Sequence, residues 1–266
     1  MKNTIINVFK TLFFFDFGLI LITLVPTLFK FKNATLSSVF DLAIPFLIIV
    51  LLTFIFTKMV EKKGVSVLES KIKFKSLLLS IALGILVPVF ILAVMWIFKD
   101  FAFSGFNKIS NLPIHLLKLA LTSALSELLY RGYLFKLYKK HYGFIASCVI
   151  TTLLFLSYNL EVLNSGKIHA LNVILISIVF CFVMDYFNNI ILSVLTHFSF
   201  LATTSLLIKT DNLFENSIIT SVVLFAIIFI LLFKKYKSFF MTVLSFILHI
   251  KKILSDKASI FISRFK

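Results

Sequence analysis

The stretch Ser126–Phe135 reads SELLYRGYLF and places a carboxylate and a guanidinium four residues apart within an otherwise apolar segment. On a helix, positions i and i+4 lie on the same face, so Glu127 and Arg131 can pair directly. Ionisable groups at membrane depth are costly and usually face a protein interior or a water-filled cavity. Glu127 and Arg131 are therefore candidate functional residues, either as catalytic groups or as a structural clamp.

Apolar residues dominate the rest of the chain as well. Of its 266 residues 60% are hydrophobic and 14% are charged, and the mean hydropathy is +1.08. A soluble domain of this size does not need so much apolar surface, so the composition predicts an all-α polytopic membrane protein. The net charge of +16 is interpreted as loop charge that faces anionic lipid. No soluble segment shows the basic and aromatic pattern of a nucleic-acid groove, so no nucleic-acid partner is expected.

Apolar windows of spanning length predict about eight transmembrane helices in a single bundle. The windows cover residues 5–29, 38–57, 76–98, 113–137, 144–160, 170–187, 190–208 and 217–233. Ser110-Asn111 as a cap and Pro113 in the first turn mark the start of the fourth helix. Asp185 is expected to cap the turn between the sixth and seventh. No internal repeat or long linker is visible, so residues 1–266 are predicted to form one transmembrane domain.

Positive charge is distributed unevenly between the predicted connections. Most of the 27 lysines and arginines lie in the N-terminus, in segments 58–75 and 136–140, or towards the C-terminus, which all fall on one side of the bundle. Because cytoplasmic loops are enriched in Lys and Arg, this pattern predicts a multi-pass protein of the cell membrane with both termini in the cytoplasm. The basic, amphipathic tail 238–266 is typical of a segment lying on anionic lipid, with a partner-docking helix as the alternative.

Three predicted helices carry polar residues at a similar depth. With a rise of about 1.5 Å per residue, Glu127, Asn159 and His197 all fall near the middle of the bilayer. Lipid offers no hydrogen bonds, so polar groups there need one another or water. The sequence therefore predicts a buried cluster of Glu127, Arg131, Asn159 and His197.

These residues resemble the motifs of the CPBP family, the CAAX-protease and bacteriocin-processing intramembrane proteases. The family's Glu-Glu-x-x-x-Arg-Gly motif is matched at 126–132, its Phe-x-x-x-His motif at 155–159, and its His-x-x-x-Asn motif at 197–201. The resemblance covers about residues 76–208. It implies a CAAX-type intramembrane endopeptidase that cleaves a membrane-proximal or prenylated peptide.

Three positions depart from the family's pattern. Ser126 stands where the resemblance implies a water-activating carboxylate, Asn159 where it implies an imidazole that holds water or a metal, and Leu201 where it implies an oxyanion-stabilising amide. A general base contributes about 10²–10⁴-fold to such a reaction, and one oxyanion donor about 10²–10³-fold. The sequence therefore predicts a catalytically degenerate member that binds a peptide or membrane-protein partner, in bacteriocin immunity or regulation. An active endopeptidase is the alternative.

Glu127, Arg131 and His197 are retained from the motifs. Glu127 is expected to form a structural pair with Arg131, and Glu127 and His197 would carry any remaining catalysis. No cofactor and no metal site are expected from the residues, since no histidine has a second ligand at i+3 or i+4, although the resemblance leaves a divalent metal open. Cys148 and Cys181 lie in apolar runs and are expected to be small buried hydrophobic residues.

Overall fold

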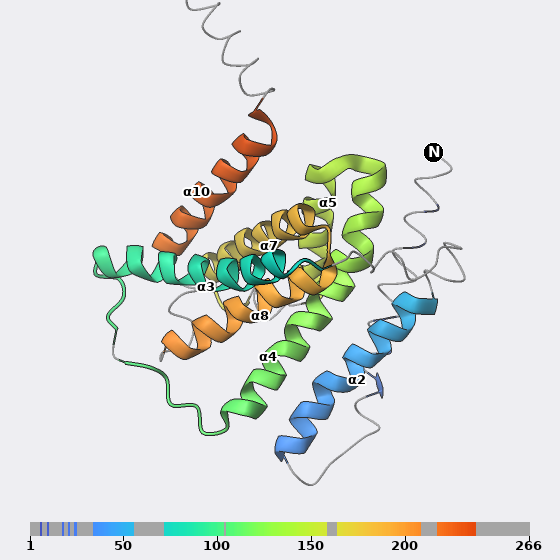
Figure 1. Cartoon of the computed structure of the whole chain (residues 1–266), viewed down its shortest axis with the longest axis horizontal. Coiled ribbons are helices and arrows are strands. Elements are labelled where there is room, and N and C mark those ends of the chain that lie inside the picture. The colour runs from blue at the N-terminus through green and yellow to red at the C-terminus, as the bar shows by residue number, and fades with distance from the viewer. Residues whose placement is uncertain are drawn as a thin grey trace, which may run out of the picture. The chain divides into compact units, whose positions relative to one another are not determined.

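A computed structural model shows a helical protein. It describes residues 34–55, 72–103, 105–158, 164–208 and 217–237, together with a few positions before residue 26. The helices are α2 (Ala34–Ile55), α3 (Phe74–Ile97), α4 (Leu112–Ser126), the π-helix η3 (Glu127–Phe135), α5 (Lys136–Tyr158), α7 (Lys167–Phe187), α8 (Ile190–Leu207) and α10 (Ile218–Lys235) (Figure 1). The predicted all-α class is confirmed. Two compact units, residues 1–224 and 225–266, divide the chain.

Five helical runs in the described part are long and apolar enough to cross a membrane. They are Phe74–Ile97, Leu112–Ser157, Lys167–Phe187, Ile190–Leu207 and Ile218–Lys235. The chain is thus a multi-pass membrane protein, as its composition indicates. The count of eight stays a prediction, because most of the window 5–29 lies outside the described residues. The tail 238–266 and most of the segment 58–75 also lie outside them.

The fourth predicted helix corresponds to α4, η3 and the first part of α5, and a kink separates it from the fifth. It begins as expected, with Asn111 at the N-cap position and a proline in the first turn, although the Asn111 side chain makes no capping hydrogen bond. The expected end at residue 137 is wrong, because the helix continues through the three lysines of segment 136–140. The interruption falls at Gly143, whose φ is 81°. Lysine is a good helix former, whereas glycine enters the left-handed region without steric cost, so the glycine sets the break.

The turn between α7 and α8 is formed by Asn188 and Asn189. Asn188 has a φ of 47°, and the Asn189 side chain accepts hydrogen bonds from the backbone N–H groups of Ile191 at 2.9 Å and Leu192 at 3.2 Å. The prediction that Asp185 caps this turn is wrong. Asp185 is still inside α7, where it forms an ion pair with Lys139 of α5. A capping side chain must come directly before the first helical turn, and that place belongs to Asn189.

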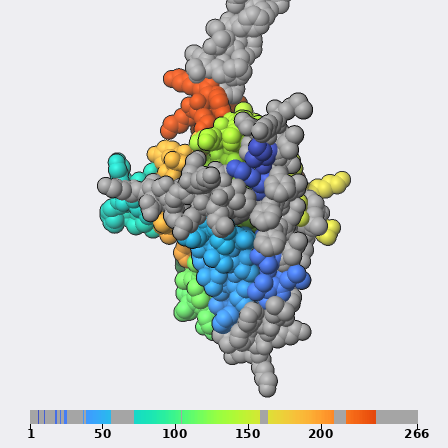
Figure 2. All heavy atoms as spheres, turned by 90° about the vertical axis from the view of Figure 1, so that its right-hand side faces the viewer, coloured from blue at the N-terminus to red at the C-terminus, as the bar shows by residue number. Residues whose placement is uncertain are grey.

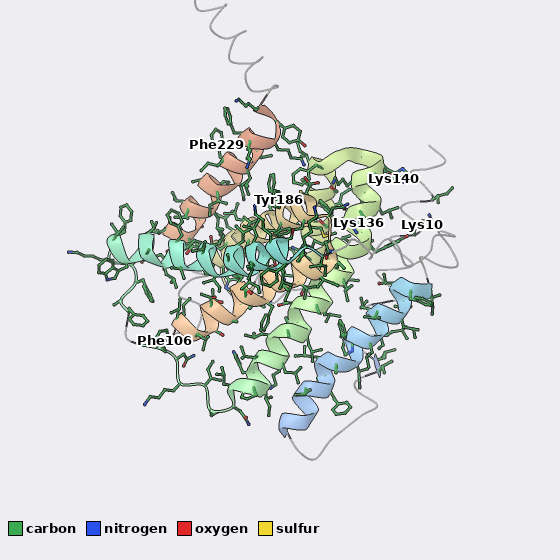
Figure 3. All side chains as sticks on the ribbon, in the orientation of Figure 1. Lys10, Phe106, Lys136, Lys140, Tyr186 and Phe229 are labelled. Atoms are coloured by element: carbon green, nitrogen blue, oxygen red, sulfur yellow. The ribbon has the colours of Figure 1, made fainter. Side chains whose placement is uncertain are left out.

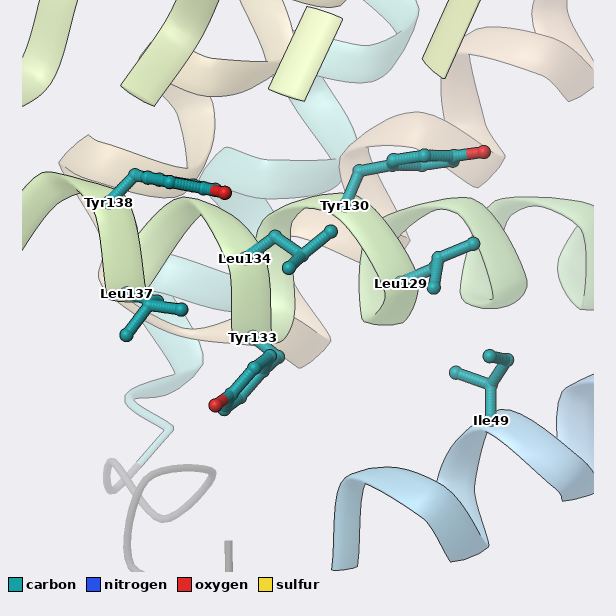
Figure 4. Packing of buried hydrophobic residues seen from close by; sticks show 7 residues of the cluster. All are labelled: Ile49, Leu129, Tyr130, Tyr133, Leu134, Leu137 and Tyr138. Atoms are coloured by element: carbon teal, nitrogen blue, oxygen red, sulfur yellow. The ribbon is translucent and has the colours of Figure 1, made fainter. Parts of the chain in front are cut away.

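The π-helix η3 lies at the centre of the first unit. Its residues 129–135 are all buried, and it contacts α2, α4, α5, α7 and α8. Figure 4 shows part of this core, in which Ile49 of α2 points toward Leu129, with Tyr130 on the opposite side of the helix. A segment buried on every side needs apolar residues all round, which explains the composition of the stretch around Arg131.

Many apolar side chains of the first unit are not covered by protein. α2 forms part of the outer surface in Figure 2. Phe106 and Tyr186, which are labelled in Figure 3, keep 67% and 69% of their surface exposed. On α3, Leu86 keeps 59% and Phe90 keeps 56% of its surface exposed. Contiguous apolar surface of this kind is rare in soluble monomers and is expected where lipid is the solvent.

Gly84 allows α3 to pack directly against the backbone of α8. A Cβ atom at this position would lie 2.4 Å from the carbonyl oxygen of Thr196 and 2.6 Å from the Cβ of Ser199. Small residues at helix crossings are a common way to bring membrane helices together. This close approach fixes the part of α8 that carries His197.

Candidate functional site

Glu127 is the first residue of η3, and its side chain is completely buried. Its Oε1 accepts hydrogen bonds from Arg131 Nη1 at 3.2 Å and from His197 Nδ1 at 3.0 Å. Its Oε2 accepts a hydrogen bond of 2.6 Å from Ser193 Oγ. Hydrogen bonds to an ionised carboxylate are stronger than those between neutral groups. Glu127 therefore fastens α8 to η3 through two side chains one turn apart.

The Arg131 guanidinium extends the same network to two further helices. Its Nη2 donates to the Oγ of Ser177 on α7 at 2.7 Å and to the carbonyl oxygen of that residue at 3.3 Å. The Oγ of Ser177 in turn lies 3.2 Å from Thr152 Oγ1 on α5. The rings of Phe155 and Phe180 lie 5.5 and 5.9 Å from the guanidinium carbon, within the range of cation–π attraction. We call Glu127, Arg131, Ser177, Ser193 and His197 the clamp.

The clamp determines which nitrogen of His197 carries a proton. An ionised carboxylate only accepts hydrogen bonds, so the Nδ1 that faces Glu127 must be the donor. Nδ1 is therefore the nitrogen held by Glu127, and Nε2 is the nitrogen left for other contacts. The ring stacks on Phe180 at a centroid distance of 4.3 Å, and 11% of the side chain is exposed. His197 is thus oriented from two sides.

The structure brings together three of the four residues predicted to cluster, Glu127, Arg131 and His197. Asn159 lies outside the described residues. Ser126 is turned away, since its Oγ donates to the carbonyl oxygen of Thr122 on its own helix at 2.9 Å. Leu201 follows His197 by one turn on α8, with a half-buried apolar side chain.

The clamp contains two serines that the motif comparison did not single out. Ser193 lies four residues before His197, so both face the same side of α8, and this spacing could have indicated its role. Ser177 lies within an apolar window of α7, where a serine that faces the protein interior is expected to bond across helices. Neither stands at a position of the three family motifs, so the resemblance gave no signal for them.

The titratable residues of the site do not form a set of three ligands. Among the described ranges, no group of three or more His, Cys, Asp or Glu side chains converges as a metal site would require. Glu127 and His197 face each other, and the carboxylate is bonded to the imidazole rather than turned toward a shared ion. Metal dependence stays an untested prediction for this chain.

Replacing Ser193 by alanine is expected to lower the free energy of unfolding by about 1.5–3 kcal/mol, because a buried carboxylate loses a donor. Urea titration in detergent micelles, followed by circular dichroism, measures the loss. Ser205→Ala is the matched control on the same helix, since Ser205 Oγ donates only to the carbonyl oxygen of Ala202. Equal losses in the two variants would show that Ser193 does not support Glu127.

The comparison with protein families gives one match. Residues 108–203 match the family described as type II CAAX prenyl endopeptidase Rce1-like. The matched segment contains α4, η3, α5, α7 and the part of α8 that carries Ser193 and His197. No curated protein and no solved structure matches the chain. The match is thus to the segment that holds the whole clamp.

Proposed function

We propose that this chain, whose residues 108–203 match the Rce1-like family of type II CAAX prenyl endopeptidases, belongs to that family and binds a peptide or membrane-protein partner without cutting it. Bacteriocin immunity, or the regulation of another membrane enzyme, is the role that such a binder would serve. In this proposal the helical core is retained, and the ion pair of Glu127 and Arg131 stabilises the packing of its helices.

The burial of Glu127 is the observation that carries this proposal. A general base must lie within hydrogen-bond reach of the water that it deprotonates. The Glu127 side chain has no exposed surface, and three donors already occupy most of the roughly four acceptor positions of a carboxylate. The only carboxylate of the first motif is therefore committed to holding helices.

Ser126 and Leu201 do not replace the general base and the oxyanion donor that the resemblance implies at their positions. The Ser126 hydroxyl donates to its own helix, and no base lies in contact with it among the described residues. Leu201 offers no hydrogen bond to a developing oxyanion, a loss that typically costs about 10²–10³ in rate. Because catalytic groups act as a unit, such losses together leave little beyond binding.

An active endopeptidase is the second candidate, and one contact favours it. The 3.0 Å hydrogen bond from His197 Nδ1 to Glu127 is the arrangement by which a carboxylate orients an imidazole. Nε2 would then be the base that takes a proton from water, in place of the carboxylate replaced by Ser126. This candidate requires the exposed 11% of His197 to include Nε2.

The charge pattern supports a location for either candidate. We propose that the chain lies in the cell membrane with both termini in the cytoplasm, since most of its 27 lysines and arginines fall on one predicted side. The same residues would bind anionic lipid headgroups. Neither candidate requires a cofactor.

Restoring the family's residues tests the proposed loss of catalysis. The parent chain and the variant Ser126→Glu/Asn159→His/Leu201→Asn are reconstituted in liposomes with farnesylated CAAX peptides. The proposal expects cleavage by the restored variant and none by the parent. Cleavage by the parent would overturn the proposal and favour the His197 mechanism, which His197→Gln would then abolish.

A further inference from the structure

The helices α5 and α7 face each other along a ladder of side-chain contacts. At one end, the rings of Phe144 and Phe182 lie 4.7 Å apart between centroids. At the other, Thr152 Oγ1 lies 3.2 Å from Ser177 Oγ. Residue numbers rise on α5 as they fall on α7, so the two helices run antiparallel. Cys148 lies midway between its two α5 neighbours, one turn from each, and therefore faces the same stretch of α7.

Cys181 is the residue of α7 that meets Cys148. Thr151, on the same face of α5, has its Oγ1 3.7 Å from Cys181 Sγ and 3.4 Å from the carbonyl oxygen of Cys148. Thr151 thus contacts both cysteines, which places them on the same part of the interface between α5 and α7. Both side chains are buried, with 5% of Cys148 and none of Cys181 exposed. The expectation that both are small buried residues is confirmed, and the packing of α5 against α7 adds that they lie close together.

This thiol pair adjoins the clamp. Cys181 follows Ser177 by one turn on α7, and its thiol lies beside the Arg131 guanidinium that Ser177 binds. A nearby cation stabilises the negative charge that develops on a sulfur as it attacks. Of the two cysteines, Cys181 is thus the better placed nucleophile, and Cys148 is placed to attack the product.

We propose that Cys148 and Cys181 form a modification site, a dithiol that hydrogen peroxide converts to a disulfide between α5 and α7. Cys181 sulfur attacks the peroxide O–O bond, which breaks to release one water and leaves a sulfenic acid. Cys148 sulfur then attacks Cys181 sulfur, forms the S–S bond and releases a second water. Two thiols lose two electrons and two protons in all, and one peroxide becomes two waters. A thiol reductant reverses the reaction.

Oxidation would act on the clamp through Arg131. The cross-link joins the α5 face that carries Thr152 to the α7 face that carries Ser177, the side chains that anchor the guanidinium. It also removes the Cys181 thiol from its place beside Arg131. The site therefore couples oxidation to the geometry of the clamp, whether or not the proposed loss of catalysis is correct.

Peroxide treatment of the intact chain in liposomes tests the site. After treatment, denaturation and alkylation, mass spectrometry is expected to find a peptide pair linked through Cys148 and Cys181, with the loss of two hydrogens. In Cys148→Ser the cross-link is lost and dimedone labels Cys181. In Cys181→Ser the cross-link is lost as well, and dimedone does not label Cys148.

Two results would overturn the proposal. One is that both thiols remain free in the folded chain at a peroxide concentration that oxidises them after denaturation. The other is that dimedone labels Cys148 in Cys181→Ser but does not label Cys181 in Cys148→Ser, which would reverse the assigned roles. Circular dichroism of each serine variant shows that it is folded before treatment, so a negative result cannot come from unfolding.

Discussion

Arg131→Met is expected to lower the free energy of unfolding by about 3–5 kcal/mol, because the substitution leaves the Glu127 charge buried without its cation. The guanidinium has 1% of its surface exposed, and it bonds Glu127 and Ser177 at once. Methionine fills a comparable volume, so the loss reports charge and hydrogen bonding rather than a cavity. Denaturant titration in detergent micelles, followed by circular dichroism, measures it.

The control for this variant is a different ion pair, between Lys139 and Asp185. The Lys139 side chain is 39% exposed and the Asp185 side chain 13%, so solvent screens this pair more than the fully buried pair of Glu127 and Arg131. Lys139→Met is therefore expected to cost far less than Arg131→Met. The double variant Glu127→Gln/Arg131→Met should recover part of the stability, since it removes both charges. Equal effects at Arg131 and Lys139 would contradict the clamp.

Gly84→Ala is expected to cost about 1–3 kcal/mol of unfolding free energy, although alanine is the better helix former. The added Cβ would lie 2.4 Å from the backbone oxygen of Thr196, which cannot turn aside as a flexible side chain would. α8 must therefore shift, and the bond from His197 to Glu127 weakens with it. Denaturant titration measures the cost, and combination with Ser193→Ala should show non-additive losses.

Leu86→Ala on the same helix is the control for Gly84. Its side chain is 59% exposed and faces away from the crossing, so a change of about 0.5 kcal/mol or less is expected. If Gly84→Ala were as stable as the parent and its loss were additive with Ser193→Ala, α3 would not set the position of α8. The clamp would then have to be held by η3 and α7 alone.

The helical class and the membrane setting could be predicted because they depend on long apolar windows. Local signals also located some boundaries, such as Pro113 at the start of α4 and Asn188 and Asn189 after α7. Charge was a poor guide to where a helix ends, since the lysines of segment 136–140 continue the helix and Gly143 interrupts it. The π-helical hydrogen bonding of Glu127–Phe135 had no signal, because helix propensity concerns the α-helix.

The site could be predicted where a motif or a shared depth identified a residue. Glu127, Arg131 and His197 meet as expected, since polar groups in lipid need one another. Ser193 and Ser177 were missed because serine is common in membrane helices and only the packing shows which hydroxyl faces inward. Cys148 and Cys181 are 33 residues apart, and their pairing depends on how α5 and α7 are aligned.

The segment that matches the Rce1-like family contains a carboxylate that is enclosed by donors. Glu127 binds side chains of η3 and α8, and Arg131 carries the link to α7. Such a pair stabilises the helical arrangement whether or not a peptide is hydrolysed. If the proposed loss of catalysis is correct, this structural role explains why Glu127 and Arg131 are present although Ser126 stands where the resemblance implies a carboxylate base.

The hydrolysis of a fluorogenic farnesylated peptide by the intact chain in liposomes tests most directly whether Glu127 is structural. The account predicts no hydrolysis above that of protein-free liposomes, and a loss of stability rather than of activity in Glu127→Gln. Hydrolysis by the parent chain that disappears in a folded Glu127→Gln variant would contradict it.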